Sequence, residues 1–188
     1  MPRKAKVTKE EVVETALCLL REEGEGALNA RAVAARLGVS TQPVFSNFPT
    51  MEKLRESLLS AAYDVYLGFL IREAERGEYP KYKSFGMAYI RFAKEEGNLF
   101  RFLFMCDRAG KELVPTPDFC QSVEMISSSR GVSLKTAERM HLELWTCVHG
   151  IATMLATSFL EFDWETVSEM LTDVYSGICA RHASEDRK

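Results

Sequence analysis

The stretch that most constrains the fold is residues 24–54, GEGALNARAVAARLGVSTQPVFSNFPTMEKL, which predicts two short helices joined by a tight turn. Asn29 is a favourable N-cap for the first helix. The apolar residues of that helix recur on one face: Val33, Ala34 and Leu37. Gly38 follows directly and is suited to the left-handed conformation that ends a helix. The pattern therefore predicts a helix, a glycine turn and a second helix.

We expect the second helix to be capped by Ser40 and to have Thr41, Gln42 and Pro43 in its first turn. Proline is tolerated there because the first N–H groups of a helix have no partner within it. The apolar contacts are expected from Val44, Phe45 and Phe48. This form is typical of a helix-turn-helix, which places its second helix in the DNA major groove. Two glycine-joined helices with no role in DNA binding are the alternative on this pattern alone.

The residues before this unit favour DNA binding. The segment MPRKAKVTK carries four cations and no acid, so it is suited to contact phosphates as a basic arm. Thr8 and Glu11 predict a capping box for a helix that runs to about Glu23. Its inward side chains are expected to be Val13, Ala16, Leu17 and Leu20.

A basic arm, a supporting helix, a helix-turn-helix and a long following helix, in this order, resemble the TetR family of transcription regulators over residues 8–58. The matching positions are Ala16, Gly24, Val33, Ala34, Gly38, Val39, Ser40, Phe45, Phe48, Glu52 and Leu54. Two positions depart from the family pattern. Phe45 stands where the family often has tyrosine, and Met51 where it often has lysine. Two phosphate contacts that the resemblance implies are therefore absent.

Composition places few further limits on the chain. Of its 188 residues, 46% are hydrophobic and 27% charged, which is ordinary for a globular protein. No apolar run approaches the roughly 20 residues that span a bilayer, and no apolar signal segment follows the basic N-terminus. We expect a cytoplasmic protein with no membrane partner. The net charge of −3 divides unevenly, with nine Lys or Arg and seven acids in residues 1–55, so the positive end is the one expected to meet DNA.

Beyond Thr50 the apolar spacing predicts helices throughout and no strand. The expected helices are 51–76, 81–96, 98–105, 117–130, 134–160 and one that begins after Asp163, with an irregular hinge loop at 107–116. The predicted fold is all-α. A helix-turn-helix DNA-binding domain is expected at 1–50, and a helical regulatory and dimerisation domain at 51–188.

Two adjacent amphipathic helices at the end of a chain can form half of a four-helix bundle. The TetR family dimerises in this manner, so the resemblance assigns a homodimer contact to residues 134–180. The expected contact residues are Val148, Ile151, Ala152, Leu155, Val167, Leu171 and Val174. Trp145, His149 and Gly150 also resemble a motif of one C-terminal branch of the family. Glycine inside a helix costs about 1 kcal/mol relative to alanine, and close helix approach at the interface would explain Gly150.

Aromatic and methionine side chains are frequent in the middle of the chain. Their helical spacing is that of a core, but deformable Met and flat rings also suit a pocket for an apolar ligand. The resemblance implies such a pocket between the middle helices. Its candidate residues are Phe69, Phe85, Tyr89, Phe92, Phe104, Met125 and Trp145.

No motif favours catalysis, a metal or a cofactor. His141 and His149 lie eight residues apart, about 12 Å along a helix, too far to hold one metal ion without other ligands. The five cysteines are scattered singly, which indicates reduced thiols. There is no Gly-rich phosphate loop and no G-x-S-x-G elbow. We expect no enzyme.

The combined interpretation is a homodimeric transcription regulator that binds a double-stranded DNA operator, a repressor released by a small hydrophobic ligand. Bases are assigned to Thr41, Gln42 and Ser46, a thymine methyl to Phe45, and phosphates to Asn29, Arg31 and Ser40. The full set expected at DNA is Lys4, Lys6, Asn29, Ala30, Arg31, Ser40, Thr41, Gln42, Pro43, Phe45, Ser46 and Asn47. The alternative is a small-molecule sensor or protein-interaction module with a vestigial helix-turn-helix, which the lost phosphate contacts favour.

Overall fold

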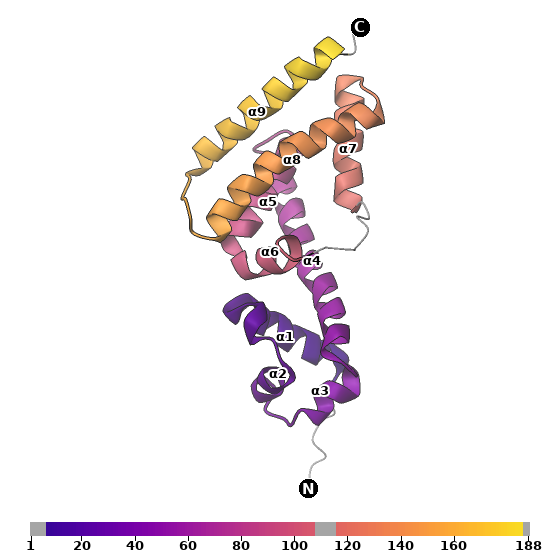
Figure 1. The fold of residues 1–188 in the computed structure, drawn as a ribbon, viewed down its shortest axis with the longest axis vertical. Coiled ribbons are helices and arrows are strands. Elements are labelled where there is room, and N and C mark those ends of the chain that lie inside the picture. Colours follow the sequence, from indigo (N-terminus) through magenta and orange to yellow (C-terminus); the bar gives the residue numbers. More distant parts are fainter. Residues whose placement is uncertain (1–6, 108–115, 186–188) are drawn as a thin grey trace. The chain divides into compact units, whose positions relative to one another are not determined.

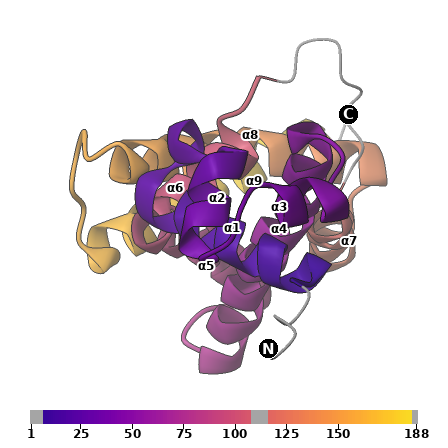
Figure 2. The ribbon, with the colours of Figure 1, turned by 90° about the horizontal axis from the view of Figure 1, so that it is seen from below.

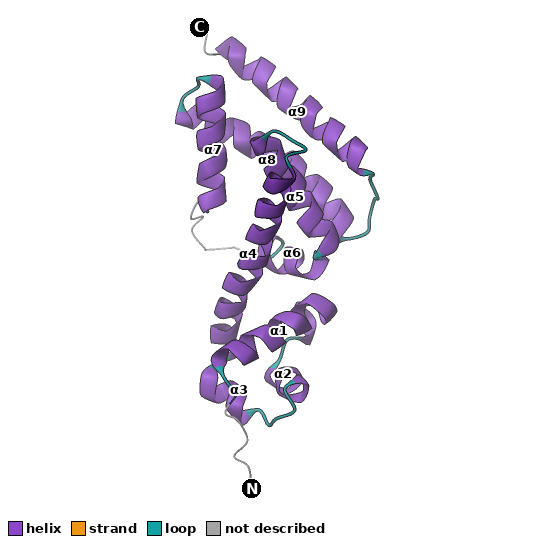
Figure 3. Ribbon diagram, turned by 180° about the vertical axis from the view of Figure 1, so that it is seen from behind, coloured by secondary structure: helices purple, strands orange, loops and turns teal. Residues whose placement is uncertain are grey.

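The structure, a computed structural model, describes residues 7–107 and 116–185. Over these residues it consists of helices and loops without a β-strand, so the prediction of an all-α fold is confirmed (Figure 3). The chain forms two compact units. The N-terminal unit comprises Met1–Gly68 and Glu96–Cys106, and the C-terminal unit comprises Phe69–Glu95 and Asp107–Lys188. The N-terminal unit thus contains more chain than residues 1–50, whose separate role as a DNA-binding domain remains a prediction.

The N-terminal unit begins with three helices, labelled in Figure 1: α1 (Lys9–Glu23), α2 (Ala30–Arg36) and α3 (Gln42–Asn47). A short 3₁₀ turn, η1 (Glu25–Ala27), joins the first two. The predicted capping box is confirmed: Thr8 Oγ1 accepts from the Glu11 N–H at 3.1 Å, and Glu11 Oε2 accepts from the Thr8 N–H at 2.7 Å. These reciprocal bonds satisfy N–H groups that the helix itself leaves without partners.

The inward face of α1 differs from the predicted one by a small rotation. Val12 and Leu19 are fully or almost fully buried, whereas Val13 and Leu17 are half-buried. The reason is that α1 packs against α2, α3 and also α6 (Gly97–Phe104), a partner that comes from far along the chain. The apolar core of this unit therefore combines local and distant residues: Val12, Ala16, Leu19, Leu20, Val33, Ala34, Val44, Phe48, Leu54, Leu58, Leu99, Phe100 and Phe102.

The helix α4 (Met51–Arg76) has the predicted bounds and ends at Gly77, whose φ of +67° favours glycine. Its residues up to Gly68 belong to the N-terminal unit and the rest to the C-terminal unit. Polar contacts hold α6 against α1. Asn98 Nδ2 donates to the Arg21 carbonyl at 2.8 Å, and the Arg21 guanidinium forms a two-point ion pair with Glu96.

The C-terminal unit contains α5 (Lys81–Glu95), α7 (Pro117–Arg130), α8 (Leu134–Ala156) and α9 (Trp164–Glu185). In this unit α5 and α8 pack against each other and both contact α7 and α9. Gly86 permits the close approach of α5, because a Cβ there would lie 3.3 Å from Leu171 Cδ1 and 3.5 Å from Val148 Cγ2. The predicted caps Ser133 and Asp163 both accept backbone N–H groups in the first turns of α8 and α9. Residues 108–115, most of the predicted hinge loop, lie outside the described residues.

The predicted end of α8 at Leu160 is wrong, because the helix ends at Ala156. Ser158 adopts a left-handed conformation with φ +53°, and the Phe159 N–H closes the turn on the Met154 carbonyl at 2.9 Å. This turn directs the chain away from the helix axis. As a result Phe159 is 74% exposed and does not continue the buried stripe of α8.

The residues predicted to form the dimer contact are mostly core residues of a single chain. One of the seven, Val174, is half-buried. The other six are buried inside the C-terminal unit: Val148, Ile151, Ala152, Leu155, Val167 and Leu171. The correction follows from the periodicity itself, because a helix shows the same apolar stripe whether it faces its own chain or a partner. A contact through α8 and α9 must therefore use their opposite faces.

No helix in the described part of the chain has the length and the apolar character needed to cross a bilayer.

Candidate nucleic-acid interface

The start of α2 is fixed by Asn29, as predicted. Its Oδ1 accepts the N–H groups of Arg31 at 3.1 Å and Ala32 at 3.0 Å, and its Nδ2 donates to the Ala27 carbonyl at 3.1 Å. The side chain is thus committed to capping. The free cation at this helix start is Arg31, whose exposed side chain has no carboxylate partner among the described residues.

A glycine turn joins α2 to α3 (Figure 2). Gly38 has φ +66°, a conformation that side chains with a Cβ rarely adopt, and the Val39 N–H bonds back to the Ala34 carbonyl at 3.0 Å. The predicted role of Gly38 is therefore confirmed. This turn determines where α3 begins relative to α2.

The predicted cap of α3 is wrong by one residue. The helix begins at Gln42 with Thr41 as its N-cap, and Thr41 makes no side-chain capping bond. Thr41 already has a helical backbone, with φ −70° and ψ −15°, whereas a capping side chain needs an extended backbone to reach the first N–H groups. Ser40 is exposed outside the helix.

The helix α3 has a buried inner side and an exposed outer side, with the half-buried Pro43 and Asn47 between them. Val44 is fully buried, and Phe48 at the C-cap is almost fully buried. Gln42, Phe45 and Ser46 are exposed, at the i, i+3 and i+4 positions that share one side of a helix. Phe45 is 46% exposed, because one residue after Val44 lies about 100° further round the helix. It therefore does not join Val44 and Phe48 in the core, and its assignment to a thymine methyl remains a prediction.

Two residues of the predicted DNA-binding set have other contacts. Ser46 Oγ donates to the Gln42 carbonyl at 2.9 Å, one turn back. Asn47 is half-buried, and its Nδ2 donates to the Pro43 carbonyl at 2.9 Å and the Val7 carbonyl at 3.1 Å. Ala30 is buried, and Pro43 and Thr41 are half-buried. The predicted Lys4 and Lys6 lie outside the described residues.

Most cations near α2 and α3 are paired with acids. Arg36 Nη2 lies 2.5 Å from Glu22 and 2.8 Å from Glu23, and this pairing lowers the pKa of the Glu22 carboxyl. Arg55 pairs with Glu25 at 2.5 Å. Arg31 therefore differs from these cations, because its exposed side chain at the start of α2 has no carboxylate partner among the described residues.

The predicted ligand residues fall into separate groups. In the C-terminal unit the rings of Phe69 and Phe92 pack edge to face with centroids 5.3 Å apart. Trp145, which is 40% exposed, stacks on His149 with ring centroids 4.9 Å apart, and the Tyr89 hydroxyl lies 2.9 Å from His149 Nδ1. Phe85 is half-buried on α5, and Phe104 belongs to the N-terminal unit, where it packs on Tyr66.

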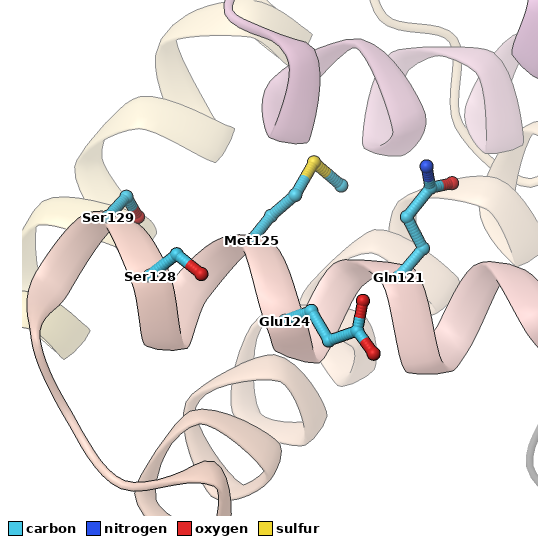
Figure 4. Close-up of a pocket in the computed structure, with 5 residues that line it drawn as sticks. All are labelled: Gln121, Glu124, Met125, Ser128 and Ser129. Carbon is cyan, nitrogen blue, oxygen red and sulfur yellow. The ribbon is translucent and has the colours of Figure 1, made fainter.

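Met125 belongs to a different feature of the C-terminal unit. It lines an open surface depression with Gln121, Glu124, Ser128 and Ser129, all on α7 (Figure 4). A depression bounded by one helix does not enclose a ligand, since ligand sites bury most of the ligand surface. The structure therefore brings Tyr89 and Trp145 together but does not bring Met125 to them.

Sequence analysis missed a half-buried tyrosine–histidine pair between α5 and α8. The Tyr82 hydroxyl lies 2.9 Å from His141 Nδ1, and the ring of Phe119 packs edge-on against His141. Burial lowers the pKa of His141 to about 4, and burial likewise raises the pKa of Tyr82. Both groups are therefore neutral, and the tautomer of His141 decides which of them donates the hydrogen bond. Among the described residues, no three His, Cys, Asp or Glu side chains form a group that could hold a metal ion.

Comparison with known proteins gives one informative relative. No family model matches the chain. The chain is 24% identical over 163 residues to an uncharacterized HTH-type transcriptional regulator of Mycobacterium tuberculosis, a match that covers 85% of this chain and 75% of the relative. The similarity therefore extends well beyond the helix-turn-helix.

Proposed function

We propose that the protein is a sequence-specific DNA-binding transcription regulator of the TetR type. The observation that carries the proposal is the two-faced α3: Val44 and Phe48 fix it to the core, and Gln42, Phe45 and Ser46 project outward. A short helix held in this way, directly after a glycine turn, presents its side chains to the edges of bases in a major groove. The description of the relative as an HTH-type regulator gives independent support.

The exposed side chains suggest distinct roles at an operator. Gln42 offers a donor and an acceptor to adenine, and the ring of Phe45 offers an apolar contact to a thymine methyl group. Arg31 is the proposed phosphate contact, because its guanidinium has no acidic partner among the described residues. Asn29 supports this contact indirectly by capping α2.

The proposal extends to assembly and control. Operators of helix-turn-helix proteins have two half-sites about 34 Å apart, which a symmetric dimer matches. We assign the dimer contact to the outward faces of α8 and α9, on which Gly150 and Gly177 lie with open space around them. A repressor released by a small apolar ligand is proposed, with Tyr89, Trp145 and His149 as its contacts.

A vestigial helix-turn-helix is the second candidate, favoured by the departures at two positions. Phe45 is exposed yet has no hydroxyl for a phosphate, and the half-buried Met51 carries no charge. Under this reading the chain is a small-molecule sensor or a protein-interaction module. The two candidates differ in one observable, the enrichment of a DNA sequence.

The deciding experiment is selection of the full chain on a random duplex pool, followed by fluorescence anisotropy on the enriched sequence at several salt concentrations. Gln42→Ala should cost about 1–3 kcal/mol at one base pair and relax the preference there. Arg31→Ala should weaken binding on every sequence alike. Gln121→Ala, an exposed glutamine on α7, is the control and should bind as wild type. A pool in which no sequence is enriched would refute the regulator and favour the vestigial reading.

A further inference from the structure

Asn47, the last residue of α3, links two segments that are 40 positions apart in the chain. Its Nδ2 donates to the Pro43 carbonyl within its own helix and to the carbonyl of Val7 at 3.1 Å. Both partners are carbonyl oxygens, so only the donor end of the amide can face them, and this fixes the orientation of the side chain. Both N–H groups of the amide are used within the protein.

A second contact joins the same two segments. The Lys9 ammonium lies 5.1 Å from the centre of the Phe48 ring, at the C-cap of α3. The Thr8–Glu11 capping box fixes the first turn of α1 immediately after Val7. Val7, the first described residue, is therefore held beside the end of α3.

The segment that precedes Val7 carries Arg3, Lys4 and Lys6 and no acid. Six residues span at most about 20 Å. Measured from Val7 beside α3, this length covers about half a turn of DNA, since one turn measures about 34 Å. Phosphates or a minor groove flanking the half-site of α3 are within reach, and the next half-site is not.

We propose that Asn47 is a positioning residue for DNA binding. It holds Val7, to which the basic N-terminal segment is joined, so that Arg3, Lys4 and Lys6 act on the same stretch of DNA as α3. The inference rests on the proposed function. It also revises the prediction that Asn47 contacts DNA directly, because the amide N–H groups that would bind a base are already donated to Pro43 and Val7.

The anchor itself is tested without DNA. Trypsin cleaves the Lys6–Val7 bond of the full chain, and the rate is followed by mass spectrometry under native conditions. Asn47→Ala and the near-isosteric Asn47→Asp, which has no N–H to donate, should both accelerate this cleavage about two- to tenfold, the factor expected for one lost hydrogen bond.

The control variant is Asn29→Ala, which also removes an asparagine with several hydrogen bonds from the N-terminal unit but has no bond to Val7. At temperatures well below each unfolding midpoint, measured by circular dichroism, it should leave the Lys6–Val7 rate unchanged. An unchanged rate in both Asn47 variants would overturn the anchor.

The functional claim is tested by a double-mutant cycle on the selected duplex. Deletion of residues 2–6 removes three cations and should make the slope of log affinity against log salt shallower by up to about 3. Asn47→Ala should weaken binding by about two- to tenfold in the full chain and have almost no further effect in the deletion, because it acts through the deleted segment. Asn29→Ala should instead be additive with the deletion.

Equal losses from Asn47→Ala in both backgrounds would show a direct DNA contact and overturn the positioning role. If the wild type bound no DNA, the proposed function would fail and the positioning role with it. The trypsin rates would in that case still decide whether Asn47 anchors Val7.

Discussion

Gly150 in α8 and Gly177 in α9 distinguish the stability of one chain from the stability of a dimer. Among the described residues, and apart from the backbone of its own helix turn and the two chain neighbours, a methyl group added at either position meets no atom within 4 Å. Glycine inside a helix is destabilising by about 0.5–1 kcal/mol relative to alanine. Gly150→Ala and Gly177→Ala should therefore each raise the free energy of unfolding of the single chain by about that amount, and its melting temperature by about 1–4 °C.

The same substitutions should have the opposite effect on a dimer that uses these faces. If the glycines allow the helices of two protomers to approach closely, an added methyl group overpacks the contact at about 1–3 kcal/mol. A twofold interface contains each glycine twice. The dimer should then weaken by at least about 2 kcal/mol, or about thirtyfold in Kd.

The assay measures both quantities on the same samples. Sedimentation velocity across a concentration series gives the dimer affinity, and thermal unfolding at the lowest concentration gives the stability of the chain. Gly68→Ala in α4 is the control for helix propensity, because its Cβ also meets open space. Gly86→Ala is the control for crowding within one chain, and it should be less stable than Gly150→Ala by about 1–3 kcal/mol because its Cβ would press on Leu171.

Two results would refute this reasoning in different ways. Unchanged assembly in both Gly150→Ala and Gly177→Ala, with the chain stabilised, would place the dimer contact elsewhere. A loss of stability in the dilute chain would show that the space around these glycines is filled within the protomer.

The C-terminal unit should also lose stability as the pH falls from about 6.5 to 4, because burial holds the pKa of His141 at about 4 and the unfolded chain takes up a proton that the folded chain does not. The loss should reach about 3 kcal/mol in urea unfolding, and a slope that persisted in His141→Gln would assign it to another group. Glu73, 2% exposed, lies 3.1 Å from Arg91 Nε, so Glu73→Ala should cost about 3–5 kcal/mol by leaving a largely buried guanidinium without its carboxylate. Arg139→Ala removes an exposed ion pair and should cost less than about 1 kcal/mol, and equal losses in the two variants would contradict this ranking.

The sequence alone determined where most helices begin and end. Thr8 with Glu11, Asn29, Ser133 and Asp163 cap the helices that they were predicted to cap. These signals are local, because a capping side chain bonds to N–H groups two or three residues away. The glycine turn at Gly38 belongs to the same class, since it depends on the backbone of one residue.

The same local chemistry explains the two boundary errors. Ser40 is a favourable capping residue, but the N-cap is Thr41, whose backbone is already helical, and Ser40 therefore lies outside the helix. The apolar character of Phe159 continued the stripe of α8, yet the left-handed Ser158 ended the helix before it. A side-chain preference is one contribution to a boundary, and the backbone conformation of the next residue can outweigh it.

The tertiary structure decided what each face of a helix meets. The stripe through Val148 and Leu155 was visible in the sequence, but periodicity states only that a face is buried and not by which chain. Asn47 and Val7 are 40 residues apart, and Arg21 and Glu96 are 75 apart. The sequence shows no pattern that predicts such pairs, because their contact depends on the path of every helix between them. Only the folded chain brings them together.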